Sequence, residues 1–488
     1  MITSTFKIIS RLSLFAALGW LSSLSADNQT PDTSSIYPEN DLPFRIQIEQ
    51  ADFSLPNGLH SGVKATYKGK WLFLAGRTNG MHSFNFDNNN FPPSMQNQVV
   101  YVVDPVKKTV VSKSLTDPSS GLTQHQVDLL SVTSPQYYRT GQTLYITGGY
   151  GVDTSSGLFS TKDVLTAINV PGLIHWVLDA YPGETAAQHI RQISDPIFRV
   201  TGGYMTKIGH TTLLVFGQNF QGFYLPSSSG EYTEQIRRFK IYDNGKKLAV
   251  KILPSKPLIQ EPNYRRRDLN VVPIVQVKCG FSVPALTALS GVFTLTGGIW
   301  TIPVIISANG NSTTKDANDP EAFKQGMNNY ACATLGLFSR RHEEMYTLLL
   351  GGLSYGFFDN GVFETDEEIP FINQVTTIKL DKHGDFKQYI MSGQYPVIIS
   401  TQSNPGNPLL FGAGAYMIQN PSLPAYRNGV LKLDGLCKEP VLLGYIVGGI
   451  QSTLPNTNVA SDSAASSYIF KVTLVPVRPE SESDSSAR

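Results

Sequence analysis

The heptapeptide Leu144-Tyr-Ile-Thr-Gly-Gly-Tyr150 joins an apolar, β-branched and aromatic run to two consecutive glycines. Such a run is typical of a buried strand, and glycine at its end is typical of backbone that needs positive φ or lies close to a neighbour. The pattern returns in full at Phe293–Ile299, Thr347–Leu353 and Tyr445–Ile450, and with one glycine at Leu72–Arg77 and Leu213–Gln218. The repetition predicts an array of equivalent structural units.

Each copy lies within a segment that reads as a four-stranded meander. In the first unit the expected strands are Gly62–Tyr67, Trp71–Ala75, Val99–Pro105 and Thr109–Lys113. The second unit continues with Val164–Val170 and Ile174–Leu178 as its third and fourth strands. In the third unit, Asn244-Gly245 between two alternating runs is a strong hairpin signal. A single meander cannot cover both of its faces, so the units are expected to pack against one another.

The ends of the repeat array indicate a closed ring. The last unit shows three clear strands, ending with Tyr468–Leu474, and the isolated strand Phe44–Glu49 supplies a fourth. Closure of this kind removes the open interface between first and last units. The sequence therefore predicts an all-β fold, a β-propeller of four-stranded blades closed by an N-terminal strand. Six blades are preferred, and seven are possible if Phe411-Gly-Ala-Gly414 heads a blade of its own.

With these features, residues 44–477 resemble the Kelch-type β-propellers, the superfamily that includes the central domain of galactose oxidase. The double glycines at 148-149, 297-298, 351-352 and 448-449 carry the resemblance, with aromatics such as Tyr101 and Trp176 on later strands. Some Kelch-like propellers are copper oxidases or sugar epimerases. The oxidase type implies a Tyr/His/Cys constellation, and no cysteine here is expected on a top loop beside a Tyr-His pair.

The two ends of the chain read as segments outside the propeller. Lys7 and Arg11 precede the apolar run Leu12–Leu21, and small residues allow cleavage before Ala26. This pattern predicts a signal peptide over residues 1–25 and export to the periplasm or the medium. Residues 26–43 are expected to form a linker and residues 478–488 a disordered tail. No later segment is long enough to cross a membrane as a helix.

Composition limits the classes of partner. The chain of 488 residues has 41% hydrophobic and 16% charged residues and a net charge of +1. That balance gives no electrostatic signature for nucleic acid. The three cysteines, Cys279, Cys332 and Cys437, are far apart and are expected as small buried core residues. No metal or other cofactor and no fixed catalytic residue is predicted, since the sequence holds no HExxH, GxSxG or phosphate-binding glycine loop.

Binding residues are expected on one face of the ring. Long segments follow the second strands or join successive units, and such loops on a rigid scaffold commonly carry function. The candidates at or just after the second-strand ends are Arg77, His82, Tyr150, Trp300 and Tyr355. Aromatic rings beside Arg suit sugar rings or peptide segments through stacking and hydrogen bonds. The alternative, favoured for Tyr150 and Trp300, is that they only pack the core between blades.

Three charged or amide-rich segments receive a structural interpretation. Arg265-Arg266-Arg267 is expected to be a solvated loop paired with nearby acids, although an acidic partner is an alternative. Asp87–Asn90 and Glu364–Glu368 have oxygen ligands that Ca²⁺ prefers, but their spacing matches no known calcium loop, so solvated loops are expected. An acid/base pair built across blades, for example from His82 and Glu364, stays open.

These observations favour an exported, monomeric propeller that binds a protein or glycan partner through its long-loop face without catalysis. The alternative is a carbohydrate-active enzyme, an epimerase, lyase or oxidase, with its site at the mouth of the channel.

Overall fold

The computed structural model describes residues 29, 31–32, 34, 36–86, 89–457 and 459–477. The expected signal peptide and C-terminal tail lie outside these residues. In the described part of the chain, no helix has the length and apolar character needed to cross a bilayer.

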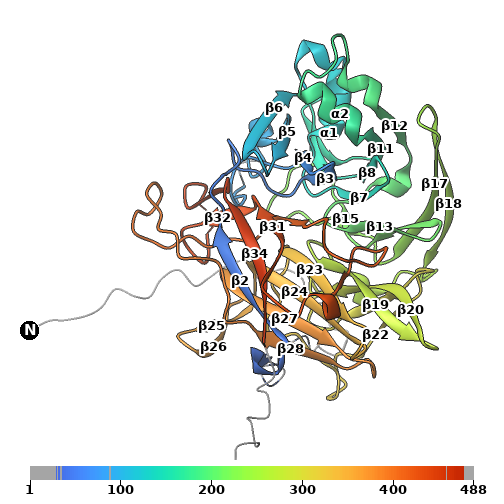
Figure 1. The fold of residues 1–488 in the computed structure, drawn as a ribbon. Helices are drawn as coiled ribbons and strands as arrows, with labels where there is room; N and C mark the ends of the chain where they lie inside the picture. Colours follow the sequence, from blue (N-terminus) through green and yellow to red (C-terminus); the bar gives the residue numbers. More distant parts are fainter. Residues whose placement is uncertain are drawn as a thin grey trace, which may run out of the picture.

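The chain is a β-propeller, in which small antiparallel sheets are arranged around a central axis (Figure 1). Five sheets have four strands. Sheet 1 contains β3 (Val63–Tyr67), β4 (Lys70–Leu74), β5 (Val99–Asp104) and β6 (Thr109–Ser114). Sheet 2 contains β7 (Gln136–Thr140), β8 (Thr143–Thr147), β11 (Val164–Asn169) and β12 (Ile190–Ser194). Sheet 3 contains β13 (Tyr204–Ile208), β14 (Thr211–Val215), β17 (Ile236–Asp243) and β18 (Leu248–Lys256). Sheet 4 contains β19 (Asn270–Lys278), β20 (Phe281–Leu289), β21 (Val304–Ser307) and β22 (Ser312–Thr314).

The ring is completed by a larger sheet and by the closing sheet. Sheet 5 contains β23 (Ala333–Ser339), β24 (Glu344–Leu353), β27 (Phe371–Leu380) and β28 (Phe386–Ile390), with β1 (Ile36–Pro38) and β30 (Leu431–Lys432) as parallel edge strands. Sheet 6 contains β29 (Tyr416–Gln419), β31 (Val441–Val447), β34 (Ile469–Pro476) and β2 (Phe44–Gln50). The expected count of six four-stranded blades is therefore corrected to five, because edge strands extend sheet 5 to six strands.

The smaller elements lie in the connections. Four two-stranded ribbons follow second strands: β9 (Tyr150–Asp153) with β10 (Leu158–Thr161), β15 (Gln218–Asn219) with β16 (Glu231–Tyr232), β25 (Gly356–Asp359) with β26 (Val362–Thr365), and β32 (Ile450–Ser452) with β33 (Ser463–Ala465). The helices are α1 (Gln124–Leu130) and α2 (Val170–Val177). Short 3₁₀ turns occupy Glu39–Asp41, Pro93–Met95, Pro118–Ser120, Ala186–His189, Pro196–Phe198, Pro262–Tyr264 and Leu433–Gly435.

The N-terminal strand closes the ring, as the sequence predicts. β2 pairs antiparallel with β34, with Phe44 opposite Pro476 and Gln50 opposite Phe470. In Figure 1 the blue β2 runs along the red β34. Phe411-Gly-Ala-Gly414 heads no separate blade among the described residues, because it leads directly into β29.

A pair of residues with positive φ follows or ends the second strand of every sheet. The pairs are Ala75-Gly76, Gly148-Gly149, Phe216-Gly217, Ser290-Gly291, Gly351-Gly352 and Gly448-Gly449. The first member has φ between 48° and 71°, which L-residues can adopt, and the second has φ between 83° and 104° and is always glycine. The structure thus requires only the second glycine of each pair. This explains why the copies with a single glycine, Ala75-Gly76 and Phe216-Gly217, adopt the same conformation as the double glycines.

Two sequence-based strands are wrong. Phe293–Ile299 is not a strand, because β20 already ends at Leu289 and Ser290-Gly291 takes the place assigned to Gly297-Gly298. Ile174–Leu178 belongs to helix α2 rather than to a strand. Asn169 caps this helix by accepting a hydrogen bond from the Gly172 N–H at 2.8 Å, and a proline in the first turn favours it further. Trp176 therefore lies on a helix.

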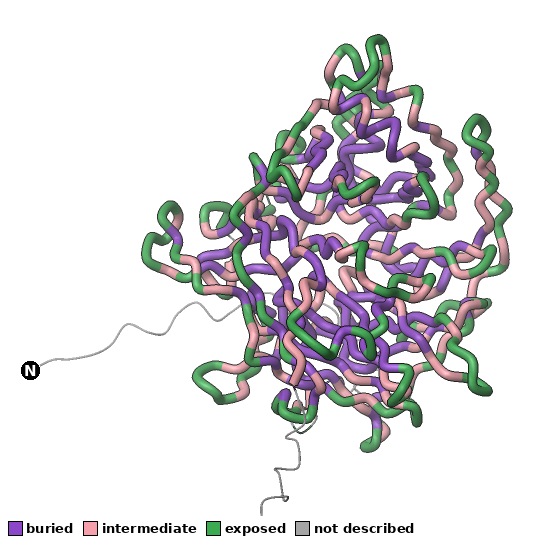
Figure 2. The backbone as a smooth tube through the Cα atoms, in the orientation of Figure 1, coloured by how far each residue is buried: buried purple, intermediate pink, exposed green. Residues whose placement is uncertain are grey.

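The core is divided among the interfaces between neighbouring sheets. Leu72 and Leu144, for example, share a cluster between sheets 1 and 2, and Phe73 and Tyr416 share one between sheets 1 and 6. Figure 2 shows the buried residues inside the ring and the exposed ones at hairpin tips.

The cysteines depart from the expectation of three buried core residues. Cys279 and Cys437 are exposed, and Cys332 is partly buried. Cys279 lies at the tip of the β19–β20 hairpin with φ of 50°, where a side chain reaches solvent.

Candidate functional site

A cavity of about 330 Å³ opens where the loops after the second strands meet the loops between sheets. We call it the upper cavity. Loops from all six sheets contribute to its lining, including His60, Tyr150, Tyr224, Arg267, Tyr330, Leu353 and Ile450. The long-loop face predicted from the sequence therefore surrounds an open cavity to which every sheet contributes.

The floor of this cavity is a belt of backbone that runs from sheet to sheet. Its members precede the innermost strands and all have positive φ, between 49° and 66°: Ser61, Ser134, Gly202, Asp268, Ala331 and Gly414. Backbone N–H groups donate to carbonyls around the belt, from Ser134 to Ser61 (2.8 Å), Gly202 to Ser134 (3.1 Å), Asp268 to Gly202 (2.7 Å), Gly414 to Ala331 (2.6 Å) and Ser61 to Gly414 (3.0 Å). These bonds fix the floor independently of side chains.

One wall of the upper cavity is aromatic and surrounds His82. The imidazole lies 4.5 Å from the Phe84 ring, 4.7 Å from Phe91 and 5.0 Å from Tyr224, between ring centroids. Its Nδ1 lies 3.0 Å from the Ser83 carbonyl oxygen. Since a carbonyl can only accept, Nδ1 carries the proton and Nε2 is left as an acceptor. Burial lowers the His82 pKa to about 4, so the ring is neutral at pH 7.

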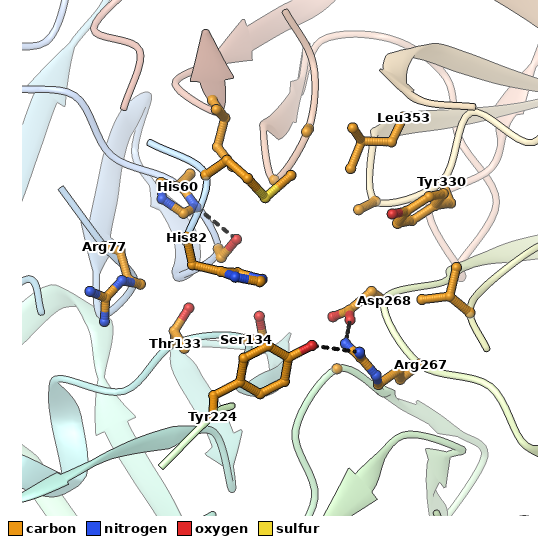
Figure 3. Close-up of a pocket in the computed structure, with 18 of the residues that line it drawn as sticks. His60, Arg77, His82, Thr133, Ser134, Tyr224, Arg267, Asp268, Tyr330 and Leu353 are labelled. Atoms are coloured by element: carbon orange, nitrogen blue, oxygen red, sulfur yellow. Dashed lines mark hydrogen bonds and ion pairs between the residues drawn. The ribbon is translucent and has the colours of Figure 1, made fainter. Parts of the chain in front are cut away.

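A polar wall adjoins the aromatic one through Tyr224 and centres on Arg267 (Figure 3). Its guanidinium donates to the Asp268 carboxylate, to the Tyr224 hydroxyl at 3.1 Å and to the Tyr232 hydroxyl at 3.1 Å. Burial opposes the charge of Arg267, but these partners outweigh it and keep the pKa of Arg267 raised. Belt residue Gly202 leaves room for the carboxylate, since a Cβ there would lie 2.8 Å from Asp268 Oδ1.

Tyr330 adds a hydroxyl to this polar wall. Burial raises its pKa, and the nearby Asp268 carboxylate raises it further, so the hydroxyl is a protonated donor at neutral pH. Figure 3 shows Tyr330 and Asp268 on one side of the cavity and His82 toward the other. The cavity thus places hydrogen-bond donors and acceptors beside an aromatic surface.

Three of the five candidate residues line the upper cavity: Arg77, His82 and Tyr150. Arg77 is 2% exposed, and its guanidinium donates to Asn79 Oδ1 at 2.9 Å and to the Pro92 carbonyl at 3.1 Å. Burial lowers the pKa of Arg77 to about 10. The head group of Arg77 is therefore used to hold the loop that carries His82.

Tyr150 likewise anchors a loop. Its hydroxyl donates to the Gly222 carbonyl at 2.7 Å, and its ring packs against Phe159 and Phe220 with centroids 5.6 and 5.5 Å away. Only its ring is left to face the cavity. The packing role that the sequence favoured for Tyr150 agrees with these contacts.

Trp300 and Tyr355 do not line the upper cavity. Trp300 is 1% exposed, donates from Nε1 to the Arg265 carbonyl at 2.7 Å, and lies under the Arg266 guanidinium at 4.7 Å. Tyr355 packs behind the wall, against the cluster that contains Val292 and Leu353.

The arginine run is not the solvated loop expected from the sequence. Arg266 is 1% exposed, and burial lowers its pKa to about 9. It donates to the Ile302 carbonyl at 2.8 Å and to the Asn263 carbonyl at 3.0 Å. Arg265 lies over the Tyr232 ring at 3.8 Å, and Arg267 points into the cavity wall. Arg266 is thus buried and its two neighbours half-buried, and each guanidinium lies over an aromatic ring and donates to nearby oxygens.

Sequence analysis missed Tyr224, Asp268 and Tyr330. Asp268 and Tyr330 stand at or next to the belt position that precedes an innermost strand. Equivalence with Ser61 and Ser134 in other sheets is the signal that would have found them. Tyr224 lies inside a long loop, where no repeat marks its position.

The acidic loop after β26 contributes to the cavity rim. Glu367 and Glu368 line the cavity, whereas Asp366 accepts a hydrogen bond from the Asn456 side chain at 2.7 Å. Of the other amide-rich loop, Asp87 lies outside the described residues, and Asn90 is buried and donates to the Tyr224 carbonyl at 2.7 Å. In the described part of the chain, His, Cys, Asp and Glu side chains form no group of three that could hold a metal ion.

Comparison with known proteins gives little beyond the fold. No family model matches the chain, and no curated protein matches it. Among solved structures the chain is similar to one titled "Structure of YjhT", with 11% sequence identity, a TM-score of 0.42, and coverage of 86% of this chain and 98% of the other. At this identity and TM-score, the likeness carries no information on ligand or activity.

Proposed function

We propose that this chain is an exported Kelch-type β-propeller that binds a glycan or protein ligand in its upper cavity, and that a single sugar ring is the group that fits best. A volume of about 330 Å³ is in the range of small-ligand pockets. A sugar ring has an apolar face, which packs on aromatic rings, and hydroxyls that both donate and accept hydrogen bonds.

The observation that carries this proposal is that one cavity combines an aromatic wall with a polar wall. On one side, His82 Nε2 accepts from within an aromatic cluster of Phe84, Phe91 and Tyr224. On the other, the Tyr330 hydroxyl donates beside the Arg267–Asp268 pair. The pairing neutralises Arg267 locally, which favours a neutral hydroxylated ligand over a strongly anionic one. Phe84, which lines the cavity and is 46% exposed, offers stacking surface for a longer glycan.

The Kelch-type family and export are each supported by one feature of the chain. Glycine at the end of each second strand supports the former, and the charged and apolar N-terminal segment, with Lys7 and Arg11, supports the latter. Fractionation of cells expressing the full chain, with N-terminal sequencing of the exported form, tests the second point.

A glycan array and a protein pull-down with the purified mature chain test the binding. We expect a restricted set of glycans to bind, with affinity reduced about tenfold by Tyr330→Phe or His82→Phe, since each removes one hydrogen bond to the ligand. Incubation of each bound sugar with the chain, followed by NMR, tests the carbohydrate-active alternative. Turnover of a sugar would replace the binding function with an enzymatic one, and binding unaffected by both variants would exclude the upper cavity.

A further inference from the structure

A second cavity of about 370 Å³ lies on the propeller axis, on the other side of the belt. We call it the lower cavity. It is lined by innermost strands from all six sheets, and its residues directly follow the belt, as Pro135 follows Ser134 and Cys332 follows Ala331. Tyrosines dominate its polar lining, and no described Asp or Glu lines it. The lower cavity is therefore a separate space with its own chemistry.

Lys64, on β3, is the cation that lines this cavity. Its ammonium has no hydrogen bond or ion pair to any side chain or carbonyl of the described residues. Burial lowers the Lys64 pKa to about 8. By contrast Lys70, on the adjoining strand, donates to the Asp104 carboxylate at 2.8 Å. Lys64 is half-buried and its ammonium has no counter-charge among the described residues, so this charge is open to an anion that enters the cavity.

Two tyrosines from the neighbouring sheets line the lower cavity together with Lys64. Tyr416, on β29 of sheet 6, accepts from the Gly62 N–H at 2.7 Å, which leaves its own proton free to donate. Tyr137, on β7 of sheet 2, has no hydrogen-bond partner for its hydroxyl in the described part of the chain. Burial raises the pKa of both, so both are protonated donors. Two amide groups of the lining are used elsewhere: Gln136 Nε2 donates to the Ser134 carbonyl and Asn270 Nδ2 to the Asn329 carbonyl, while Gln136 Oε1 has no partner among the described residues.

We propose that the lower cavity is an anion-binding site, in which a small oxyanion, a carboxylate or a tetrahedral sulfate or phosphate group, binds the Lys64 ammonium and accepts from Tyr137 and Tyr416. A charged donor and two neutral hydroxyl donors, with no competing carboxylate, match the acceptors of such an anion. This site is independent of the ligand proposed for the upper cavity.

Calorimetric titration of the purified chain with sulfate, and separately with acetate, tests the site at constant ionic strength. Both anions keep their charge between pH 6.5 and 9.5. We expect one saturable site whose affinity falls about tenfold or more over that range, because Lys64 loses its proton. The other titratable groups of the cavity, Tyr137, Tyr138, Tyr204, Tyr416 and Cys332, all have raised pKa values and stay neutral near pH 8.

Variants test whether the anion binds at Lys64 rather than at another cationic side chain. Lys64→Met should abolish the titration, and the matched surface control Lys207→Met should leave it unchanged, since Lys207 is exposed on β13. Unaltered binding by Lys64→Met, or affinity independent of pH, would overturn the proposal. Binding lost only in Arg267→Met would place the anion in the upper cavity instead.

If Lys64→Met does not fold, amine acetylation of the wild-type chain with peptide mapping replaces it. Sulfate should slow labelling of Lys64 at least fivefold and leave Lys207 unaffected, and equal labelling with and without sulfate would contradict the site.

Discussion

The upper and lower cavities lie on one axis and are separated only by the belt, yet they differ in what builds them. Loops supply the upper cavity, and the arginine at its centre, Arg267, is paired with Asp268. Innermost strands supply the lower cavity, whose single cation, Lys64, has no partner among the described residues. Strand positions repeat from sheet to sheet, whereas loops vary freely. The comparison indicates that specific recognition belongs to the upper cavity and simple charge complementarity to the lower one.

The largest expected effect comes from breaking the paired charge in the upper cavity. Arg267→Met should lower the free energy of unfolding by about 3 kcal/mol at pH 7, because it leaves a partly buried carboxylate unpaired. This is the low end of the usual range, since the Asp268 side chain is 27% exposed. Urea denaturation measures it. Adding Asp268→Asn should recover part of the loss, and a double variant no more stable than the single one would contradict the pairing.

Removing the unpaired charge of the lower cavity should change the free energy of unfolding in the opposite direction. Lys64→Met is expected to raise the free energy of unfolding by about 1 kcal/mol at pH 7, since it removes a half-buried cation that has no counter-charge. The folded pKa is about 8 and the unfolded value about 10.5, so the wild type gains stability as pH rises between them. The difference between variant and wild type should therefore shrink from pH 8 to 10. Parallel denaturation curves at several pH values check this, and a pH-independent difference would refute it.

An effect of similar size, on the acid side, is expected for His82 in the upper cavity. Its pKa falls from 6.5 to about 4 on folding, chiefly through burial, with Arg267 and Arg77 adding repulsion. The unfolded chain therefore takes up the proton first, and wild-type stability declines as pH drops from 6.5 toward 4. His82→Phe should become more stable relative to wild type by about 1.5 kcal/mol over that range. His60 is unchanged in both proteins and cancels. Equal acid sensitivity would show that His82 is solvated.

The smallest difference separates two tyrosines of one loop face. Tyr330→Phe should weaken glycan binding by about tenfold, as a lost hydrogen bond predicts. Tyr355→Phe should change it less than twofold, because Tyr355 lies behind the cavity wall. Titration of both variants with one bound glycan measures the contrast. Equal losses would mean that the wall, rather than the Tyr330 hydroxyl, controls affinity.

The ring could be predicted from sequence because each sheet demands a glycine at the same place. The second residue of each pair, such as Gly76 or Gly149, has φ near 90°, which glycine adopts readily. The repeated glycine can therefore be recognised in the sequence. The same reasoning failed at Gly297-Gly298. These glycines lie in a turn, and the pair that follows the second strand of sheet 4 is Ser290-Gly291. The reasoning also failed at Trp176, because a buried helix and a buried strand are equally apolar.

The candidate site could be predicted only in outline. His82 was found because it follows a second strand closely, but Asp268 and Tyr330 precede innermost strands, where the conserved feature is backbone conformation rather than residue type. The burial of Arg266 had no local signal, since its partners are carbonyls and the Trp300 ring from distant positions. Contacts between residues far apart in the sequence cannot be predicted from the spacing of residue types.

The pairing of β2 with β34 has a consequence for biosynthesis. A chain that has emerged as far as sheet 5 already presents β2 with no partner, because β34 is the last strand to be made. Throughout translation the nascent N-terminus must stay extended or covered, since an unpaired edge can recruit a strand from another molecule. A product that stops short of Ile469 would keep that edge permanently, and is expected to be aggregation-prone and quickly degraded rather than to survive as a smaller ring.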